Sequence, residues 1–340
     1  MEKAQRDSTA THSAYQRSVA SVGQAIVPEE GIASLLPENL SLVDQERKRE
    51  PPVTVVIVNH NAGGYLQNCV ASALPEVEEL VVVDNASSDG SAEHLRNMFS
   101  HEPKLEMFLN KRNLGFAKAC NFGSKFSTSP YVLYLNPDSE VTPGAIERMV
   151  EVMEQDPNVG MVGGYIEGPD GREQAGGRRA VPTPWRAFVR AFGLYRLGKR
   201  YPRLFSDFTL HLDPLPSHPI EVEAISGCCM LVRRQAIQNV GPLDDGYFLH
   251  CEDLDWCMRF REKGWKILFV PGARLIHWKG GSSDARPLFV EWHKHKGMMR
   301  FYRKFFRHQY PGPLIWLVFI GIWVRFTGIV VYHSSKYLIK

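Results

Sequence analysis

Three strand-like runs of this chain end in acidic residues, and this pattern limits the folds that the chain can adopt. The runs lead to Asp84, to Asp138 and to the pair Glu252 and Asp253. In parallel α/β sheets, ligands bind at the carboxyl ends of the strands. Carboxylates gathered there favour a metal-assisted reaction on a phosphate-bearing substrate. We therefore expect an enzyme with an α/β fold.

The composition fits a folded protein with appendages. The chain has 340 residues, of which 44% are hydrophobic and 23% are charged, as in globular proteins. Its net charge of +3 is too small to argue for nucleic acid as a partner. The 6 cysteines lack the paired spacing of a zinc site, and no secretory signal follows Met1. A reduced, cytosolic compartment is therefore expected.

Three regions follow one another along the sequence. Residues 1–50 are polar and predict a mobile tail, with one short helix around Ile32–Leu36. Residues 51–290 alternate strand-like and helix-like segments, which predicts a doubly wound, mostly parallel, Rossmann-like sheet. Within this region, the Gly-, Pro- and Arg-rich stretch 167–220 predicts an irregular functional loop or lid. Residues 291–340 are first basic and then apolar.

Hydrophobic periodicity and turn residues predict the individual elements. The predicted strands are Val53–Val58, Leu80–Val83, Glu106–Leu109, Tyr131–Leu135, Val159–Ile166, Glu221–Val232 and Lys266–Val270. The predicted helices are Tyr65–Ala73, Ala92–Phe99, Ala117–Phe126, Pro143–Gln155, Arg234–Asn239 and Leu254–Lys263.

The acidic residues after the first strands each have two interpretations. Asp84 directly follows a buried strand, where a carboxylate can accept hydrogen bonds from a ribose or a base, and a turn residue is the alternative. Asp138 closes the sequence Asn136-Pro137-Asp138 after another strand. A carboxylate there can hold a divalent cation together with diphosphate oxygens and water, or it can cap the next helix.

The later candidates are also open to a structural interpretation. Glu252 and Asp253 precede a predicted helix, where a carboxylate can act as a general base or simply favour the helix N-terminus. His277 ends a strand-like run before a Gly/Ser loop, as a metal ligand or a structural histidine. Contact with a diphosphate, or exposure as a solvated charge, is expected of Lys118, Arg178 and Arg179.

A series of stretches, collinear between about 53 and 283, carries a resemblance to a known family. They are Val55–Asn61, Val83–Gly90, Asn113–Asn121, Leu135–Asp138, Ser226–Arg234 and Glu252–Arg259. In these stretches the chain resembles the family-2 glycosyltransferases of bacteria, which have the GT-A fold, and especially their rhamnosyltransferase-like branch. The motifs are specific for the family and much less so for the sugar.

The resemblance implies roles for individual residues. The nucleotide-sugar part would cover about 51–165, and the acceptor and catalytic part about 166–290. Asp84 would hold the base or ribose, in a pocket lined by Val58 and His60. Asp138 matches the last acid of the family's metal-binding motif, whose first acid is here Asn136. His277 matches the late histidine ligand and Asp253 the catalytic base. Further substrate-binding residues would be Asn113, Lys118, Asn136, Arg178, Gly227, Glu252 and Trp256.

The implied reaction is an in-line displacement that inverts the anomeric carbon and needs Mg²⁺ or Mn²⁺. The expected donor is dTDP-rhamnose, and the expected acceptor is a glycan or a polyprenyl-diphosphate-linked glycan of the cell envelope. A UDP-hexose donor is the alternative within the family. A non-catalytic nucleotide-sugar-binding membrane protein would not need Asp253. A nucleotidyltransferase fits less well, because no Gly-rich basic loop follows the first strand.

The C-terminal region predicts contact with a membrane. Its cations are Lys294, Lys296, Arg300, Arg303, Lys304 and Arg307. At about 1.5 Å per residue, the apolar stretch Leu314–Val331 that follows barely spans a hydrocarbon core of roughly 30 Å. Arg325 within it would cost about 2.5–3.5 kcal/mol at the bilayer centre. We therefore expect helices that lie in, or dip into, the cytoplasmic leaflet of the inner membrane, with basic side chains on anionic headgroups. A core helix or a contact between copies of the chain is the alternative.

Overall fold

The computed structural model describes residues 51–201, 203–278 and 286–338. The predicted tail 1–50, its helix Ile32–Leu36 and most of the Gly/Ser loop behind His277 therefore lie outside the described residues.

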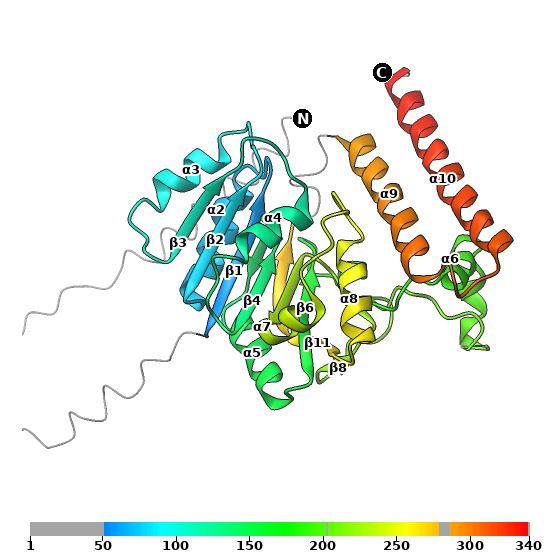
Figure 1. The fold of residues 1–340 in the computed structure, drawn as a ribbon, viewed down its shortest axis with the longest axis horizontal. Coiled ribbons are helices and arrows are strands. Elements are labelled where there is room, and N and C mark those ends of the chain that lie inside the picture. Colours follow the sequence, from blue (N-terminus) through cyan, green and yellow to red (C-terminus); the bar gives the residue numbers. More distant parts are fainter. Residues whose placement is uncertain (1–50, 202, 279–285, 339–340) are drawn as a thin grey trace, which may run out of the picture. The chain divides into compact units, whose positions relative to one another are not determined.

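A sheet forms the middle layer of the molecule (Figure 1). Nine strands of the described chain build it in the order β3-β2-β1-β4-β10-β6-β11-β5, with β8 paired to β11. Their bounds are β1 Val53–Asn59, β2 Glu79–Asp84, β3 Leu105–Leu109, β4 Tyr131–Leu135, β5 Ser139–Val141, β6 Val159–Glu167, β8 Ile220–Glu221, β10 Cys229–Arg233 and β11 Lys266–His277. A separate two-stranded sheet joins β7, Arg178–Arg179, to β9, Ala224–Ile225.

Most neighbours in the large sheet run parallel. Strand β1 is parallel to β2 and β4, β2 is parallel to β3, and β6 is parallel to β11. Strand β10 lies between β4 and β6 and is antiparallel to both, and β5 and β8 are antiparallel to β11. The predicted α/β fold with a mostly parallel sheet is confirmed.

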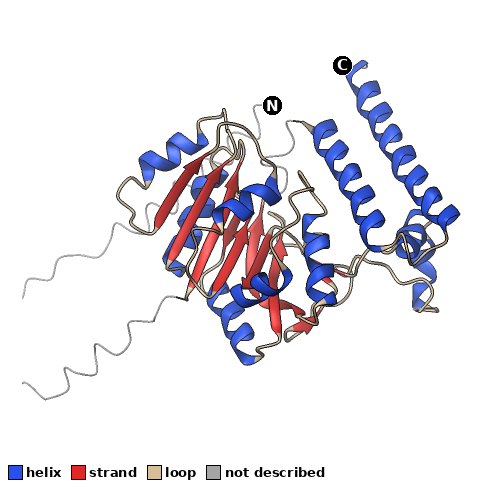
Figure 2. Cartoon of the chain, viewed as in Figure 1, coloured by secondary structure: helices blue, strands red, loops and turns tan. Residues whose placement is uncertain are grey.

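Helices cover both faces of the sheet (Figure 2). Because successive side chains of a strand point to opposite faces, Val55 and Ile57 enter one apolar cluster, whereas Val56 and Val58 enter the other. The first cluster includes residues of α2 and α5, and the second includes residues of α4 and α8. The helices are α2 Tyr65–Ala73, α3 Ser91–Met98, α4 Phe116–Gly123, α5 Ala145–Gln155, α6 Pro184–Ala191, α7 Arg234–Val240, α8 Glu252–Glu262, α9 Pro287–Phe305 and α10 Gly312–Leu338.

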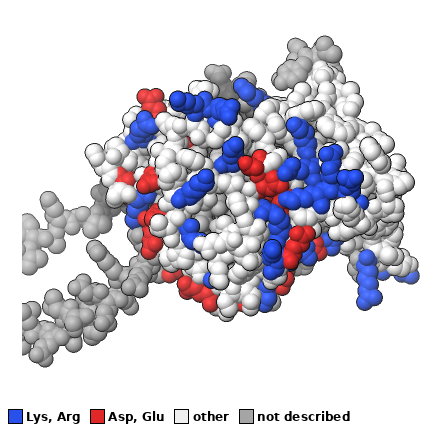
Figure 3. Space-filling model, in the orientation of Figure 1, with Lys and Arg blue, Asp and Glu red and all other residues white. Residues whose placement is uncertain are grey.

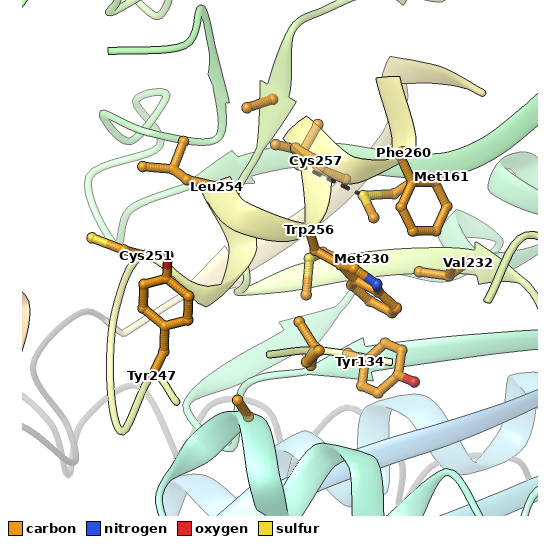
Figure 4. Packing of buried hydrophobic residues seen from close by; sticks show 14 of the residues in the cluster. Tyr134, Met161, Met230, Val232, Tyr247, Cys251, Leu254, Trp256, Cys257 and Phe260 are labelled. Carbon is orange, nitrogen blue, oxygen red and sulfur yellow. Dashed lines mark hydrogen bonds between the residues drawn. The ribbon is translucent and has the colours of Figure 1, made fainter. Parts of the chain in front are cut away.

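Trp256 of α8 lies in the centre of the second cluster (Figure 4). Its ring meets the ring of Tyr134 edge-on at 5.3 Å between centroids, and it meets Phe260 at the same distance. The indole N–H donates to the carbonyl oxygen of Gly241 at 2.9 Å. The side chain is 0% exposed. The prediction that Trp256 binds substrate is therefore wrong, because a fully buried ring in the core cannot reach one.

The structure corrects the prediction around Pro143. Residues Ser139–Val141 form β5, a strand that the sequence did not predict, and the helix predicted from Pro143 begins only at Ala145, as α5. Strand β5 pairs with the end of β11, so that Ser139 faces His277. This pairing joins segments far apart in the sequence and overrides the local signals of a helix start. Asp138 therefore leads into a strand and does not cap a helix.

Two other predicted segments have a different organisation. The run Glu221–Val232 is divided among β8, β9 and β10, and β11 continues past Val270 to His277. The stretch 167–220 is not irregular throughout, because it holds β7, α6 and a 3₁₀ helix at Leu194–Lys199. Helix α6 begins with Pro184 after Thr183, whose hydroxyl accepts the N–H of Arg186.

The C-terminal helices also differ from the prediction. The apolar segment Gly312–Ser335 of α10 has 24 residues, or about 36 Å at 1.5 Å per residue, and is long enough to span a membrane. Only 11% of its most apolar stretch is buried, which excludes a core helix. Arg325 reaches back to α9, where its Nη1 lies 3.2 Å from Nε2 of His295. This contact gives the guanidinium a hydrogen-bond partner but does not neutralise its charge.

Candidate active site

A pocket of about 210 Å³ lies where the carboxyl ends of β4, β6 and β11 meet the first turn of α8. Its lining residues are Phe116, Asn136, Ile166, Gln174, Ala175, Gly177, Ser226, Gly227, Cys228, Leu249, His250, Glu252, Asp253 and His277. We call this cavity the Asp253 pocket. It brings together the predicted site residues Asn136, Gly227, Glu252, Asp253 and His277.

Asp253 enters the pocket from a strained turn. The preceding residues His250 and Cys251 have φ angles of 68° and 70°, in the left-handed region that non-glycine residues rarely adopt. Glu252 and Asp253 are the first two residues of α8 rather than the segment before it. Asp253 is only 9% exposed, and its Oδ2 accepts the backbone N–H of Gly227 at 3.0 Å. Backbone strain of this kind is typical of functional sites.

Arg179 forms an ion pair with Asp253. It belongs to β7, in the stretch predicted as a lid, and its Nη2 also donates to the carbonyl oxygen of Ile225 at 3.1 Å. Burial disfavours the guanidinium charge, but the Asp253 carboxylate outweighs this effect, so that the pKa of Arg179 is raised. Arg179 therefore contacts the candidate base and is not a solvated surface charge.

The neighbouring Arg178 is directed away from the pocket. Its Nε lies 2.8 Å from Oε1 of Glu173, and its Nη2 donates to the carbonyl oxygen of Asp213 at 2.8 Å. The guanidinium also lies over the ring of Phe269. Adjacent residues of a strand point to opposite sides, so only one of the two arginines can face Asp253. The prediction that Arg178 contacts substrate is therefore wrong.

Glu252 has a different environment from Asp253, although both line the pocket. Burial, together with the charge of Asp253, raises the pKa of Glu252 to about 8. Its Oε2 is buried and has no hydrogen-bond partner among the described residues. Glu252 is therefore largely protonated at pH 7. Two neighbouring acids in different environments can take different roles in one reaction.

The raised pKa of Glu252 predicts a stability that falls with rising pH. Between the ordinary pKa of 4.5 and the folded value of about 8, the folded state binds more protons than the unfolded state. The free energy of unfolding should then fall by up to about 1.4 kcal/mol per pH unit in this range. Glu252→Gln should remove this contribution, as measured by denaturant unfolding at pH 6 and pH 8. Glu262→Gln at the exposed end of α8 is the control, and an unchanged slope in Glu252→Gln would contradict the assignment.

Asp138 and His277 form the second half of the site. Nε2 of His277 lies 3.2 Å from Oδ1 of Asp138, and Nδ1 lies 2.9 Å from Oε1 of Gln174. Burial opposes a charged imidazole, but the Cys228 sulfur and the Asp138 carboxylate outweigh it and raise the pKa of His277 to about 10. The 3.2 Å contact lacks hydrogen-bond geometry, so that Oδ1 of Asp138 is buried without a hydrogen-bond partner among the described residues.

These residues fit a divalent cation that binds together with a diphosphate. A buried carboxylate oxygen without a partner is costly, and a cation would satisfy it. In the described part of the chain, no group of three or more His, Cys, Asp or Glu side chains could hold a metal ion. Mg²⁺ is usually bound through one or two carboxylates, with phosphate oxygens and water completing the shell. Asp138 and His277 therefore fit as the protein's share of such a shell.

The predicted nucleotide-binding residues lie at the ends of β1 and β2, where Asn59 is the register partner of Asp84. Oδ1 of Asp84 accepts from Nδ2 of Asn59 at 2.8 Å, and its Oδ2 accepts the N–H of Ser87 at 3.0 Å. Nδ1 of His60 lies 3.0 Å from the carbonyl oxygen of Asn85, and Val58 is buried. Each Asp84 oxygen keeps a second lone pair for a ligand.

The tight turn at Gly115 connects the predicted nucleotide-binding residues at the ends of β1 and β2 to the Asp253 pocket. Nδ2 of Asn85 donates to the carbonyl oxygen of Gly115, and the next residue, Phe116, lines the pocket. Gly115 has a φ of 85°, and a Cβ there would lie 2.7 Å from the carbonyl oxygen of Phe248. Only glycine fits this position. Asn113 accepts the Gly115 N–H at 2.8 Å, and Lys118 is exposed on α4.

Among the pocket residues that sequence reasoning did not single out, Gln174 and His250 matter most for its chemistry. Gln174 orients the imidazole of His277, but it lies in the long stretch 167–220, where no periodic pattern predicts its position. His250 lines the pocket, and burial lowers its pKa to about 4, so its side chain is neutral at pH 7. The only signal for His250 was its place just before the acidic pair.

Residues 54–241 match the family described as glycosyl transferase family 2. The chain belongs to this family. It is a glycosyl-transfer enzyme that uses a nucleotide-sugar donor. The predicted family and the predicted GT-A fold are both confirmed.

Individual family members and solved structures are also similar to this chain. N-acetylglucosaminyl-diphospho-decaprenol L-rhamnosyltransferase of Mycobacterium tuberculosis is 28% identical over 276 residues, which cover 77% of this chain and 87% of that protein. The mannosyltransferase PcManGT of Pyrobaculum calidifontis, solved with GDP-Man and Mn²⁺, has a TM-score of 0.52 at 15% identity and covers 86% of this chain and 81% of its own.

GalNAc-T7, solved with UDP, GalNAc and Mn²⁺, has a TM-score of 0.56 at 19% identity. The likeness covers 75% of this chain, which spans about half of that protein, 48% of its length. At such low identities, the two solved structures support the fold of this glycosyltransferase and not its donor.

Proposed function

We propose that this glycosyltransferase is inverting and metal-dependent, and that it moves rhamnose from dTDP-rhamnose to a glycan or lipid-linked acceptor in cell-envelope polysaccharide synthesis. One observation carries the reaction type: the buried Asp253 and the Asp138–His277 pair meet at one pocket. The similarity to the mycobacterial rhamnosyltransferase supports the donor and the polyprenol-linked acceptor. A UDP-hexose is the alternative donor.

Asp253 is the general base of the proposed reaction. It takes the proton of the acceptor hydroxyl while that oxygen attacks the anomeric carbon of the donor. The bond from the anomeric carbon to the diphosphate oxygen breaks, and the diphosphate leaves with the electron pair. The attack comes from the face opposite the leaving group, so the configuration inverts. The N–H of Gly227 fixes Asp253 during this step.

Arg179 restricts how the acceptor can approach Asp253. Its guanidinium occupies Oδ2 of Asp253, the oxygen that Gly227 also contacts. A base must come within about 2.6–3.2 Å of the proton that it takes. The acceptor hydroxyl therefore replaces Arg179 at the carboxylate, or approaches its other oxygen.

Asp138 and His277 would hold Mg²⁺ or Mn²⁺. When bound, such a cation neutralises the negative charge of the departing diphosphate. Asn136, which lines the pocket where the family motif has an acid, leaves one charge fewer beside the diphosphate. The imidazole of His277 must be neutral to coordinate a metal, so its proton would be released on binding.

A panel of nucleotide sugars tests the donor. The protein is incubated with each donor, Mg²⁺ or Mn²⁺ and a lipid-linked acceptor, and the released nucleotide is identified. We expect nucleoside diphosphate, and most of it from dTDP-rhamnose. Preference for a UDP-hexose would replace the donor and keep the reaction. Release of pyrophosphate would indicate nucleotidyl transfer instead, and donor-induced thermal stabilisation without any release would indicate a non-catalytic binding protein.

The enzyme is proposed to act at the cytoplasmic face of the inner membrane. Large side chains of α10 are exposed, among them Trp316 at 67% and Val324 at 64%. Yet α10 packs along α9, whose many cations cannot enter hydrocarbon. A helix tied in this way to a basic partner fits a position in the interface better than a full crossing. A lipid-linked acceptor would be reached from this position.

Membrane association predicts that the full-length protein sediments with vesicles that contain anionic lipid. The expected result is binding at low salt, because apolar contacts of α10 and headgroup contacts of α9 act together. The measurement is the protein fraction in the pellet without detergent. A protein that stays in the supernatant at low salt would refute the association, whatever its activity towards nucleotide sugars.

A further inference from the structure

Apart from the Asp253 pocket, a groove of about 720 Å³ lies between α9 and α10. Its α9 side is formed by Met299 and Arg303, with Arg307 just beyond the helix, and its α10 side includes Trp316, Phe319 and Trp323. We call it the α9–α10 groove. It joins an apolar wall to two cations, which is the chemistry of a site for an amphiphilic anion.

The two cations of the groove differ from their neighbours. Arg300 and Lys304 of α9 both form ion pairs with Asp244, at 2.9 Å in each case. Arg303 and Arg307 form no ion pair within the described residues, and both are exposed. The guanidinium of Arg303 lies over the ring of Phe319 at 5.9 Å. The groove therefore carries positive charge that the protein itself does not neutralise.

The surface around the groove is divided into a basic part and an uncharged part. Basic side chains gather over α9, and a broad uncharged surface lies beside them over α10 (Figure 3). A lipid at this boundary would place its phosphate among the cations and its chains along the apolar helix. Arginine is well suited to a phosphate, because its planar fork can donate two hydrogen bonds to the oxygens.

We propose that the α9–α10 groove binds one anionic phospholipid, with the phosphate held by Arg303 and Arg307 and an acyl chain against Trp316, Phe319 and Trp323. This inference rests on the proposed membrane association and names the lipid class that it uses. A neutral lipid would fill the apolar wall but leave the cations without a partner. Free phosphate would lack the contacts of the chain. Both are therefore weaker ligands than an anionic phospholipid.

Helix α9, which forms one side of the groove, also packs against the turn that leads to Asp253. Gly297 of α9 packs so tightly against this turn that a Cβ there would lie 2.7 Å from the carbonyl oxygen of His250. Lys304 contacts Asp255 of α8 at 2.6 Å. The same helix thus carries the lipid site on one side and supports the first turn of α8 on the other.

Native mass spectrometry of the full-length protein in a non-ionic detergent tests the proposal. The probes are phosphatidylglycerol, phosphatidylcholine and inorganic phosphate. We expect one phosphatidylglycerol molecule to remain bound at concentrations where phosphatidylcholine and phosphate do not. Arg303→Gln with Arg307→Gln should weaken this binding about 30-fold, at about 1 kcal/mol for each cation. Arg303→Lys with Arg307→Lys should restore much of it.

The matched control changes two exposed cations elsewhere, Arg96→Gln and Lys125→Gln, and should leave lipid binding unchanged. Equal retention of phosphatidylcholine, or undiminished phosphatidylglycerol binding in the double glutamine variant, would overturn the groove as an anionic-lipid site. Release of nucleoside diphosphate, measured on the same samples, reports separately on the proposed reaction. It should persist in the double glutamine variant with a soluble acceptor.

Discussion

Asp253→Asn should lower turnover by about 10²–10⁴-fold, the usual effect of losing a general base, and should leave donor binding nearly intact. Asparagine keeps the shape of the side chain at the first turn of α8 and can still accept the N–H of Gly227. It cannot take the proton of the acceptor hydroxyl. The turnover number is measured by release of nucleoside diphosphate, and the dissociation constant of the donor by calorimetry.

The structure also decides which acid is the alternative base. Asp255 does not line the pocket. It is bound by Tyr247 at 3.1 Å, by Arg259 at 2.7 Å and by Lys304 at 2.6 Å, and its exposure is 0%. Glu252 lines the pocket, and its Oε2 has no hydrogen-bond partner among the described residues. Its raised pKa of about 8 means that it could act as a base only in its deprotonated form, so its activity would rise towards pH 8. If Asp253→Asn keeps the turnover of the natural enzyme, Asp253 is not the base, and Glu252→Gln becomes the decisive variant.

The parts of the fold that were predictable from sequence depend on local signals. The runs at Val53 and Tyr131 are rich in large apolar residues, and the strands found there match the prediction to within one residue. Helix α2 matches at both ends. Strand β5 was not predictable in this way, because its three residues are held by pairing with β11, which is distant in sequence. The antiparallel direction of β10 likewise depends on its neighbours β4 and β6.

The candidate site also combines features that local sequence signals predict with features that depend on pairing between distant segments. Asn136 and His277 meet at one pocket because the ends of β4 and β11 lie at one edge of the sheet, and that rule can be applied to a sequence. Asp253 reaches the same pocket from the first turn of α8, and the strand-like run predicted before Glu252 is not a strand in the structure. The side on which an arginine of β7 lies depends on how a two-residue strand pairs with β9. Nothing in the sequence distinguishes Arg178 from Arg179. Trp256 was assigned by its place in a motif, and packing against Tyr134 gives it a structural role instead.

Removing the carboxylate of Asp138 should abolish metal-dependent donor binding. Asp138→Ala takes away the buried oxygen that lacks a hydrogen-bond partner in the described chain. It also leaves His277 as the protein's only expected ligand in this pair. Charge stabilisation by a catalytic cation is worth several kcal/mol, so we expect donor affinity with Mn²⁺ to fall by at least about 10²-fold. Calorimetric titration of the donor, with and without Mn²⁺, measures the effect.

His277→Ala should weaken metal-dependent binding less than Asp138→Ala, because the carboxylate brings the negative charge that a divalent cation needs. The matched control is Asp156→Asn, which removes a partly exposed carboxylate paired with Lys266 at 2.8 Å; exposed pairs of this kind contribute little.

Gln174→Ala frees the imidazole of His277 from its contact at 2.9 Å. Loss of a contact that orients a metal ligand typically costs about 10–100-fold in metal affinity. Unchanged Mn²⁺ dependence in both Asp138→Ala and His277→Ala would exclude this pair as the metal site. A cation near the pocket would then have to stabilise the diphosphate, and Arg179 would be the first residue to test.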